Sequence, residues 1–206
     1  MDRKTHWEQV WTTKASTEVS WYQADPTLSR TLLREIGTDP SRAILDVGGG
    51  DSHLVDVVLA DGLGRITVLD LSGAALARAR TRLGARADEV TWIEADVTTV
   101  VLPPQSVDIW HDRAVFHFLT APDDRARYAA VAASAVRPGG SLVIATFAAD
   151  GPLRCSGLEV ARYTPEGIAE ALGDAFRLVR GFGDVHRTPT GAEQRFSVAV
   201  LRRTAT

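Results

Sequence analysis

"ILDVGGGDSHL", the stretch from Ile44 to Leu54, places a short apolar run containing Asp46 directly before three consecutive glycines. The apolar run is typical of a buried strand, and a helical pattern follows it. Gly48, Gly49 and Gly50 are therefore expected to form the first strand-to-helix turn of a doubly wound sheet, where ligands bind. Glycine permits positive φ and lets the backbone approach a ligand closely. The alternative interpretation is a tight turn that serves packing alone.

The type of ligand is narrowed by the spacing of these glycines. The dinucleotide fingerprint G-x-G-x-x-G, counted from Gly48, finds Gly50 but then His53 in the place of the third glycine. A nicotinamide dinucleotide is therefore disfavoured. Asp46, two residues before the first glycine, indicates instead a ligand that carries a cationic amine near the loop.

Strand-like and helix-like segments alternate outward from this stretch, as in βαβ units. After Gly157 the pattern changes to one helix, "TPEGIAEALG", and two strands that are expected to pair antiparallel, "FRLVRGFG" and "QRFSVAVLRR", separated by the turn-rich "DVHRTPTGAE". "RPGG", residues 137–140, is expected to end a helix and turn into the next strand. The five strands expected before these are "RAILDV", "RITVLD", "EVTWIEA", "SVDIWHD" and "SLVIATF".

Composition excludes several classes of protein. The 206 residues are 45% hydrophobic and 24% charged, which suits one domain with a full core. A net charge of -3 lacks the basic excess of a dedicated nucleic-acid binder. The single cysteine excludes an internal disulfide, and the histidines show no metal-binding spacing, so no metal site is expected. With no bilayer-length apolar run and no secretory h-region, we expect a cytoplasmic protein without membrane contact.

Two further acids lie where the next strands end. Asp70 ends "TVLD", 20 residues after Gly50, and its carboxylate is suited to accept both hydroxyls of a ribose. Asp96 follows the third strand, where it is suited to accept a hydrogen bond from the exocyclic amine of adenine. Each acid alone is also consistent with a helix cap. Three acids at successive strand ends favour a nucleoside site.

The motifs "LDVGGGDS", "VLDLS", "EADVT", "VDIWHDRAVFHFL" and "RPGGSLVIATF" resemble, in order and spacing, those of class I S-adenosylmethionine-dependent methyltransferases over residues 40–150. The resemblance implies S-adenosyl-L-methionine as cofactor and S-adenosyl-L-homocysteine as product. It implies an α/β fold with a doubly wound, mostly parallel seven-stranded Rossmann-like sheet, an antiparallel final strand, and helices on both faces. The family's last loop glycine is Ser52 here. The implied cofactor-binding residues are Asp46, Gly48, Gly49, Gly50, Asp70, Leu71, Asp96, Val97 and His111.

The end of the fourth strand is where this family places the acceptor. Within "WHDRAVFHFL", His111, Asp112 and His117 are candidate catalytic residues, and His117 is the first choice because imidazole can take a proton near neutral pH. A histidine satisfied by local hydrogen bonds is the alternative, and Asp112 is equally suited to pair with Arg113. Phe116 and Arg113 are expected to contact the acceptor.

Further acceptor contacts are expected from both ends of the chain. Trp21 and Tyr22, with Trp7 and Trp11, are suited to a flap that excludes water, although packing of a helix on the sheet edge fits as well. Cys155 follows the fifth strand, where it can overhang the acceptor or be a buried hydrophobe. His186 and Gln194 lie beside the late hairpin, with no assigned role.

The sequence therefore predicts one methyltransferase domain over residues 1–206. Its parts are a helical or flap segment (1–35), a cofactor-binding core (40–150), and an acceptor-side helix and β-hairpin (151–206). The expected reaction is transfer of a methyl group to N, O or S of a small molecule by in-line displacement. The alternatives are a protein-lysine methyltransferase, suggested by the fourth-strand motif, a non-catalytic cofactor-binding protein and, more weakly, a nicotinamide oxidoreductase. The oligomeric state is not predicted.

Overall fold

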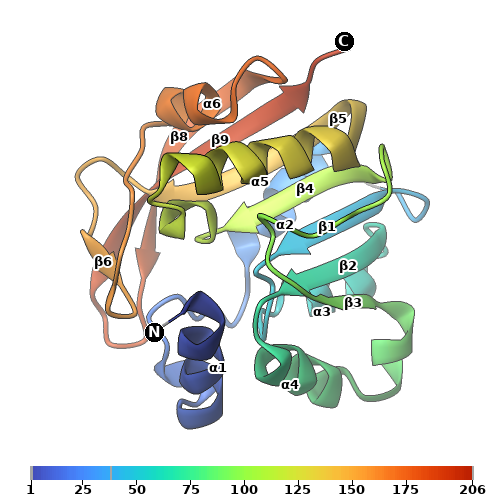
Figure 1. The fold of residues 1–206 in the computed structure, drawn as a ribbon. Coiled ribbons are helices and arrows are strands. Elements are labelled where there is room, and N and C mark those ends of the chain that lie inside the picture. Colours follow the sequence, from blue (N-terminus) through green and yellow to red (C-terminus); the bar gives the residue numbers. More distant parts are fainter. Residues whose placement is uncertain (1, 38, 206) are drawn as a thin grey trace.

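A computed structural model describes residues 2–37 and 39–205, and these fold around one large sheet (Figure 1). The sheet has seven strands in the order β3-β2-β1-β4-β5-β9-β8. The first five are parallel, and β9 runs antiparallel to both of its neighbours, β5 and β8. The predicted fold class is confirmed. The strands are β1 (Ala43–Val47), β2 (Arg65–Asp70), β3 (Thr91–Glu94), β4 (Val107–Arg113), β5 (Val136–Phe147), β8 (Phe176–Arg187) and β9 (Glu193–Arg203).

Helices cover both faces of this sheet. One buried cluster joins α5 and α6 to the side of the sheet that carries Leu45 and Trp110. A second joins α2, α3 and α4 to the side that carries Ile44 and Ile109. The alternation follows from the two-residue period of a strand, which sends successive side chains to opposite faces. The helices are α1 (Arg3–Thr13), α2 (Thr27–Ile36), α3 (Leu54–Asp61), α4 (Gly73–Leu83), α5 (Pro122–Ala135) and α6 (Pro165–Leu172).

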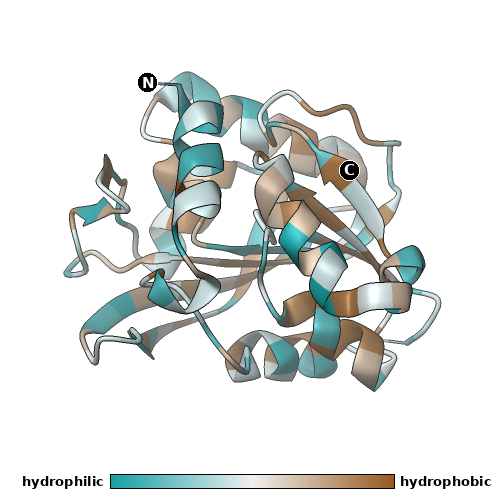
Figure 2. Ribbon diagram, turned by 90° about the horizontal axis from the view of Figure 1, so that it is seen from below, coloured by the Kyte–Doolittle hydropathy of each residue, from teal (hydrophilic) through white to brown (hydrophobic). Residues whose placement is uncertain are grey.

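Burial explains why the central strands read as nearly continuous apolar runs. In Figure 2 the hydrophobic colour concentrates in the strands between the two helical layers, whereas the helices alternate between both colours. β4 is buried along almost its whole length, as is usual for a parallel strand covered on both faces. No helix within the described residues is long and apolar enough to cross a membrane.

Three boundaries differ from the expected ones. β8 continues through Arg187, so the first four residues of "DVHRTPTGAE" pair with β9 and only 188–192 forms the turn, because backbone pairing needs no apolar side chains. β5 already begins at Val136, so "RPGG" lies within an irregular start of the strand, with Gly139 at φ 74°. A short hairpin of β6 (Arg154–Cys155) and β7 (Leu158–Glu159) was not predicted.

Candidate active site

The glycine turn after β1 leaves no room for side chains because other parts of the protein fill that space. Gly48 has a φ of 64°, and a Cβ there would lie 2.0 Å from Cγ2 of Val115. A Cβ on Gly49 would lie 2.5 Å from Oδ2 of Asp46. Both packing and backbone conformation therefore require glycine, and the turn brings β1 against the segment that follows β4.

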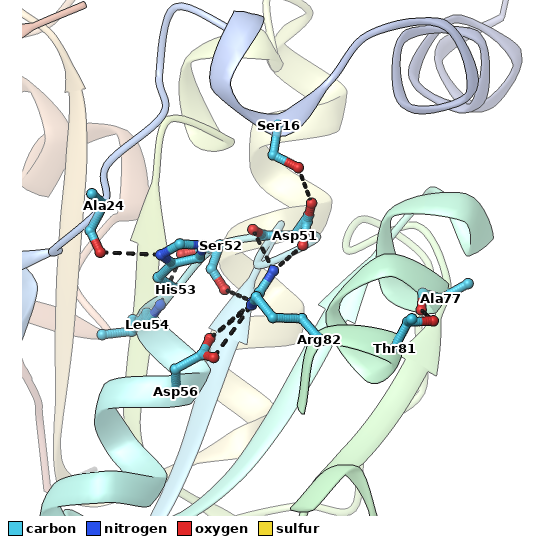
Figure 3. Close-up of polar contacts among 10 residues, drawn as sticks. All are labelled: Ser16, Ala24, Asp51, Ser52, His53, Leu54, Asp56, Ala77, Thr81 and Arg82. Carbon is cyan, nitrogen blue, oxygen red and sulfur yellow. Dashed lines mark hydrogen bonds and ion pairs between the residues drawn. The ribbon is translucent and has the colours of Figure 1, made fainter. Parts of the chain in front are cut away.

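The rest of the loop is held by Arg82 from α4 (Figure 3). Its guanidinium pairs with Asp51 and with Asp56, the latter at 2.9 Å, and donates to the Ser52 carbonyl at 2.8 Å. The N-terminal segment adds a hydrogen bond from Ser16 to Asp51. Ser52 stands where the resembled family has its last loop glycine. It fits here because its hydroxyl accepts a hydrogen bond from the Leu54 amide at 3.1 Å.

A buried hydrogen-bonded chain links three elements beside this loop. Asp46 on β1 and His111 on β4 are register partners, with Oδ1 2.7 Å from Nδ1. Nε2 of the same imidazole lies 2.8 Å from Oγ of Ser29 on α2. All three residues are buried. The chain fixes the orientation of Asp46, whose carboxylate was expected to meet a cationic amine.

Asp70 lies at the end of β2 with its carboxylate in a low-dielectric environment. Burial raises the pKa of this carboxyl to about 7, and the nearby Asp46 carboxylate also raises it. The Ser72 amide, which donates to Oδ1 at 2.8 Å, lowers the pKa and so opposes both effects. A carboxyl group with so high a pKa lacks the hydrogen-bond donors that would stabilise its charge. Two hydroxyls of a ribose would supply such donors.

Asp96 lies after β3 and faces the N-terminal helix. Its Oδ1 accepts from the amide and hydroxyl of Thr98 at 2.8 and 2.7 Å. Its Oδ2 lies 3.4 Å from Nη2 of Arg3, which also pairs with Asp124. The Asp96 carboxylate is therefore fixed at the rim of the site, with α1 above it.

These residues surround a cavity with two adjoining compartments. The larger one, about 810 Å³ including its opening, is lined by both Asp70 and Asp96. The smaller one, about 610 Å³, is lined by Asp46 and His111. Volumes of about 300–1,000 Å³ are typical of small-molecule sites. The residues that line both compartments are Trp11, Trp21, Val47, Gly48 and Arg113.

The N-terminal segment forms one wall of this cavity. Trp7 packs edge-on against Trp21 and Phe118, with ring centroids 5.6 and 5.0 Å apart. Glu8 anchors the helix to the start of α4, since its carboxylate accepts from the Ser72 hydroxyl at 2.7 Å. α1 therefore lines the cavity and packs against the start of α4.

The structure places some of the expected acceptor contacts in this cavity. Arg113 and Trp21 line both compartments, Cys155 lines the larger one, and Tyr22 lines the smaller one. Leu71, Val97, Gly48 and Asp70, which are among the cofactor-binding residues that the family resemblance implied, line the larger compartment. Burial raises the pKa of the Cys155 thiol to about 11, so it remains protonated near neutral pH.

Three other expected site residues point into the core instead. His117 and Phe116 are fully buried and do not line the cavity, and Nδ1 of His117 lies 3.3 Å from the Phe147 amide. Asp112 is also fully buried. Its carboxylate accepts from Tyr128 at 2.7 Å and from the Val115 amide at 2.9 Å, so it stabilises the turn after β4 and does not pair with the neighbouring Arg.

Burial also sets the protonation of these groups. Desolvation, with the positive charge of Arg113 adding to it, lowers the pKa of His117 to about 3. Desolvation raises the pKa of Asp112 to about 6, against its hydrogen bonds. A general base must reach the proton that it removes. The geometry gives neither side chain such a route, and their positions correct our expectation that they face the acceptor.

Several lining residues were not predicted. Arg3, Val115, Phe118 and Leu119 line the larger compartment, and Ser16 and Ser29 line the smaller one. Phe118, the fifth residue of "AVFHFL", takes the cavity-facing place that we expected of Phe116. The short helix η3 (Phe116–Phe118) produces this rotation. The only sequence signal for these directions was the spacing of side chains within this single helical turn.

The sheet order is that of a Rossmann-like fold, in which ligands bind at the carboxyl ends of the parallel strands, and Asp46, Asp70 and Asp96 lie at or just after the ends of β1, β2 and β3. Residues 44–140 match the family model described as a methyltransferase domain. This match, over 97 of the 206 residues, makes the chain similar to methyltransferase domains, and the motifs and the fold support S-adenosylmethionine as the cofactor. No curated protein sequence matches the chain.

Solved structures share this fold at low sequence identity. One, concerned with the conversion of a disulfide bond into a thioacetal group during echinomycin biosynthesis, has a TM-score of 0.79 and 19% identity and covers 98% of this chain and 93% of its own. The Burkholderia thailandensis 1,6-didemethyltoxoflavin-N1-methyltransferase has a TM-score of 0.67 and 24% identity, covering 98% and 84%. The Bradyrhizobium japonicum N-methyltransferase NodS has a TM-score of 0.70 and 16% identity, covering 98% and 99%.

Proposed function

We propose that this enzyme transfers the methyl group of S-adenosylmethionine to N, O or S of a small-molecule acceptor bound in the cavity beneath α1. The observation that carries the proposal is the division of the cavity wall. Asp70 and Asp96 line the β2–β3 side, and Arg113 and Cys155 line the β4–β5 side. One side suits a nucleoside, and the other is left for an acceptor.

The described residues fit the cofactor chemically. Asp70 would hold the ribose hydroxyls, whose donated hydrogen bonds would offset the burial that raises the pKa of this carboxyl to about 7. Asp46, oriented by His111, would face the methionine amine from the smaller compartment. Asp96 and Val97 would hold the adenine. S-adenosylmethionine supplies an electrophilic methyl group on its sulfonium.

The protein would act mainly by positioning and by excluding water. Positioning of two reactants is worth up to about 7–11 kcal/mol of the barrier. Trp7, Trp11 and Trp21 from the N-terminal segment cover the cavity with apolar surface. The thiol of Cys155 and the imidazole of His117 are both in their neutral forms near pH 7. A nucleophile that carries its own lone pair therefore suits this site better than one that must be deprotonated there.

A small molecule is favoured over a protein lysine because the N-terminal helix covers one side of the cavity. Three residues tie α1 to the domain: Arg3 to Asp96, Lys4 to Glu94, and Glu8 to Ser72. A side chain from a folded protein would have to pass this helix. The toxoflavin-precursor N1-methyltransferase, whose structure contains 1,6-didemethyltoxoflavin and S-adenosylhomocysteine, offers a precedent for a small acceptor on this fold.

Formation of S-adenosylhomocysteine in fractionated lysate tests the proposal. We expect turnover with the low-molecular-weight fraction, and about tenfold or more slower turnover at limiting S-adenosylmethionine when Asp70→Asn replaces the wild-type enzyme. Turnover confined to the protein fraction would identify a protein methyltransferase. Cofactor binding without turnover in either fraction would contradict the enzymatic proposal and favour a non-catalytic cofactor-binding protein.

A further inference from the structure

The guanidinium of Arg113 is a positive charge that the described part of the protein does not neutralise. Its Nη1 donates to the Trp21 carbonyl at 3.1 Å. Its Nη2 is buried and has no hydrogen-bond partner. Arg113 forms no ion pair with any carboxylate in residues 2–37 and 39–205. Buried charges in proteins are normally paired, because desolvation of an unpaired ion costs several kcal/mol.

The surroundings of this guanidinium are apolar or neutral. The Phe196 ring lies beneath it, with Cζ 5.2 Å from the ring centroid. Desolvation lowers the pKa of Arg113 to about 10, and the positive charge in turn lowers the pKa of both His117 and His186. Asp184 acts on Arg113 only through longer-range electrostatics. At pH 7 the site therefore holds one unpaired positive charge.

The location of the charge favours the acceptor over the cofactor as its partner. Arg113 ends β4, and its contacts come from Trp21 and from Phe196 on β9. The residues that fit the cofactor lie on β1 and after β2 and β3, on the other side of β4 in the strand order. Asp46 and Asp70 already supply negative charge there. The guanidinium lines both compartments, and its contact with Phe196 lies on the side of β4 away from these cofactor-facing residues, where the acceptor is proposed to bind.

We propose that Arg113 binds the acceptor through a carboxylate, and that the acceptor is an apolar or aromatic acid carried as a monoanion. This deepens the proposed function and rests on it. A monoanion fits because the only other Arg or Lys that lines the cavity among the described residues, Arg3, is already paired with Asp96 and Asp124. A doubly charged phosphate would leave a net negative charge beside the aspartates. An aromatic body suits walls formed by Trp7, Trp21 and Phe118.

The carboxylate would form the hydrogen bond that Nη2 lacks. Arginine presents its N–H groups in a planar fork that matches a carboxylate. Charge pairing inside an apolar wall would orient the acid relative to the methyl donor. Arg113 is then a substrate-binding residue, retained at a cost in stability.

Calorimetry and tryptophan fluorescence with two matched probes test this proposal. The protein is first saturated with S-adenosylhomocysteine, and benzoate or the neutral benzamide is then added. For the wild type we expect saturable benzoate binding with a dissociation constant of about 1 mM, which is typical of a fragment. Benzamide should bind at least about tenfold more weakly. Arg113→Met should weaken benzoate binding at least about tenfold, remove the preference, and change S-adenosylhomocysteine affinity less than about threefold.

Other outcomes would overturn the proposal in distinguishable ways. Equal binding of benzoate to the wild type and Arg113→Met, or no benzoate binding to the wild type, would exclude carboxylate recognition by Arg113. An about tenfold loss of S-adenosylhomocysteine affinity in Arg113→Met would assign the guanidinium to the cofactor's own carboxylate. Failure of the wild type to bind S-adenosylhomocysteine would instead contradict the proposed function.

A stability measurement separates ligand binding from a structural role. Arg113→Met keeps most of the aliphatic volume and removes the unpaired charge, so its melting temperature should equal or exceed that of the wild type. A structural arginine would give a lower melting temperature with unchanged selectivity between benzoate and benzamide, and this result would contradict the proposal.

Discussion

The Nδ1 atom of His111 and the Oδ1 atom of Asp46 lie 2.7 Å apart across the pair of neighbouring strands β1 and β4. The second imidazole nitrogen lies 2.8 Å from the hydroxyl of Ser29, so one buried chain joins two strands and α2. This arrangement holds the Asp46 carboxylate beside the glycine turn, in the smaller compartment of the cavity. The contact therefore connects the fold directly to binding of the cofactor's amine.

Substitution of His111 by Phe should weaken only the methionine end of cofactor binding. Asp46 would lose the hydrogen bond that orients it, and S-adenosylhomocysteine affinity should fall about tenfold, equivalent to about 1.4 kcal/mol. Adenosine, which lacks the amino acid, should bind with unchanged affinity in calorimetry. Equal losses for both ligands would show that His111 acts through general packing and not through Asp46.

Substitution of Asp70 by Asn should have opposite effects on stability and on binding. The wild-type carboxyl has a pKa of about 7, above its ordinary value of 3.8, so ionisation at higher pH costs folding stability. Asp70→Asn removes this cost, and its melting temperature at pH 8 should exceed that of the wild type by about 2–4 °C for each kcal/mol relieved. At pH 4 the two proteins should melt alike.

The same variant should bind S-adenosylhomocysteine about ten- to a hundredfold more weakly, because hydrogen bonds to a charged group contribute about 1.5–3 kcal/mol. Wild-type affinity should fall as pH falls through about 7, where the carboxylate becomes protonated. Asp150→Asn, which alters an exposed ion pair with Arg195, is the matched control. A pH-independent affinity in the wild type would contradict the assignment of Asp70 to the ribose.

His117 should contribute to acid sensitivity of the fold. Its pKa is about 3 in the folded protein and 6.5 ordinarily, so the unfolded state takes up the proton first as pH falls. The neutral imidazole stabilises the fold fully above pH 6.5. Between pH 6.5 and about pH 3, its contribution to the folding equilibrium constant falls by up to tenfold for each pH unit. His117→Phe should flatten this decrease in urea unfolding curves.

The kinetic role first expected of His117 is tested by the same variant. With the imidazole buried away from the cavity, a folded His117→Phe enzyme should keep its turnover within about threefold and keep the pH profile of the wild type. A loss of about a hundredfold, with cofactor affinity intact, would restore the general-base hypothesis.

The N-terminal helix should close the site through Glu8. Glu8→Ala removes the bonds from α1 to Ser72 and to the Ala74 amide, the latter 3.2 Å long, and should weaken S-adenosylhomocysteine binding about tenfold. Lys4→Ala, on the same helix, breaks an exposed ion pair and should change affinity little. Equal effects of both variants in calorimetry would contradict a specific anchoring role for Glu8.

Much of the cofactor side was predictable because it depends on local patterns. Strand ends follow from apolar runs, and the ends of parallel strands meet at one sheet edge, so Asp46, Asp70 and Asp96 were placed correctly near the cavity. The predicted sheet was confirmed for the same reason. The contacts of Arg82 and Ser29 join residues 31 and 82 positions apart, which no local pattern indicates.

The acceptor side was harder to predict because it depends on one irregular turn. After β4, Ala114 has a φ of 69°, and the three-residue helix η3 follows. This turn directs Phe118 toward the cavity and His117 into the core. A shift of one position in such a turn exchanges the two directions, and propensities do not specify it.

The most direct test of whether this site binds S-adenosylmethionine, with Asp70 at the ribose, is calorimetric titration of the wild type and of Asp70→Asn with S-adenosylhomocysteine, adenosine and NAD. We expect the wild type to bind S-adenosylhomocysteine more tightly than adenosine and not to bind NAD, and we expect Asp70→Asn to weaken binding of both nucleoside ligands by about tenfold or more. Tight binding of NAD with no binding of S-adenosylhomocysteine would contradict this expectation.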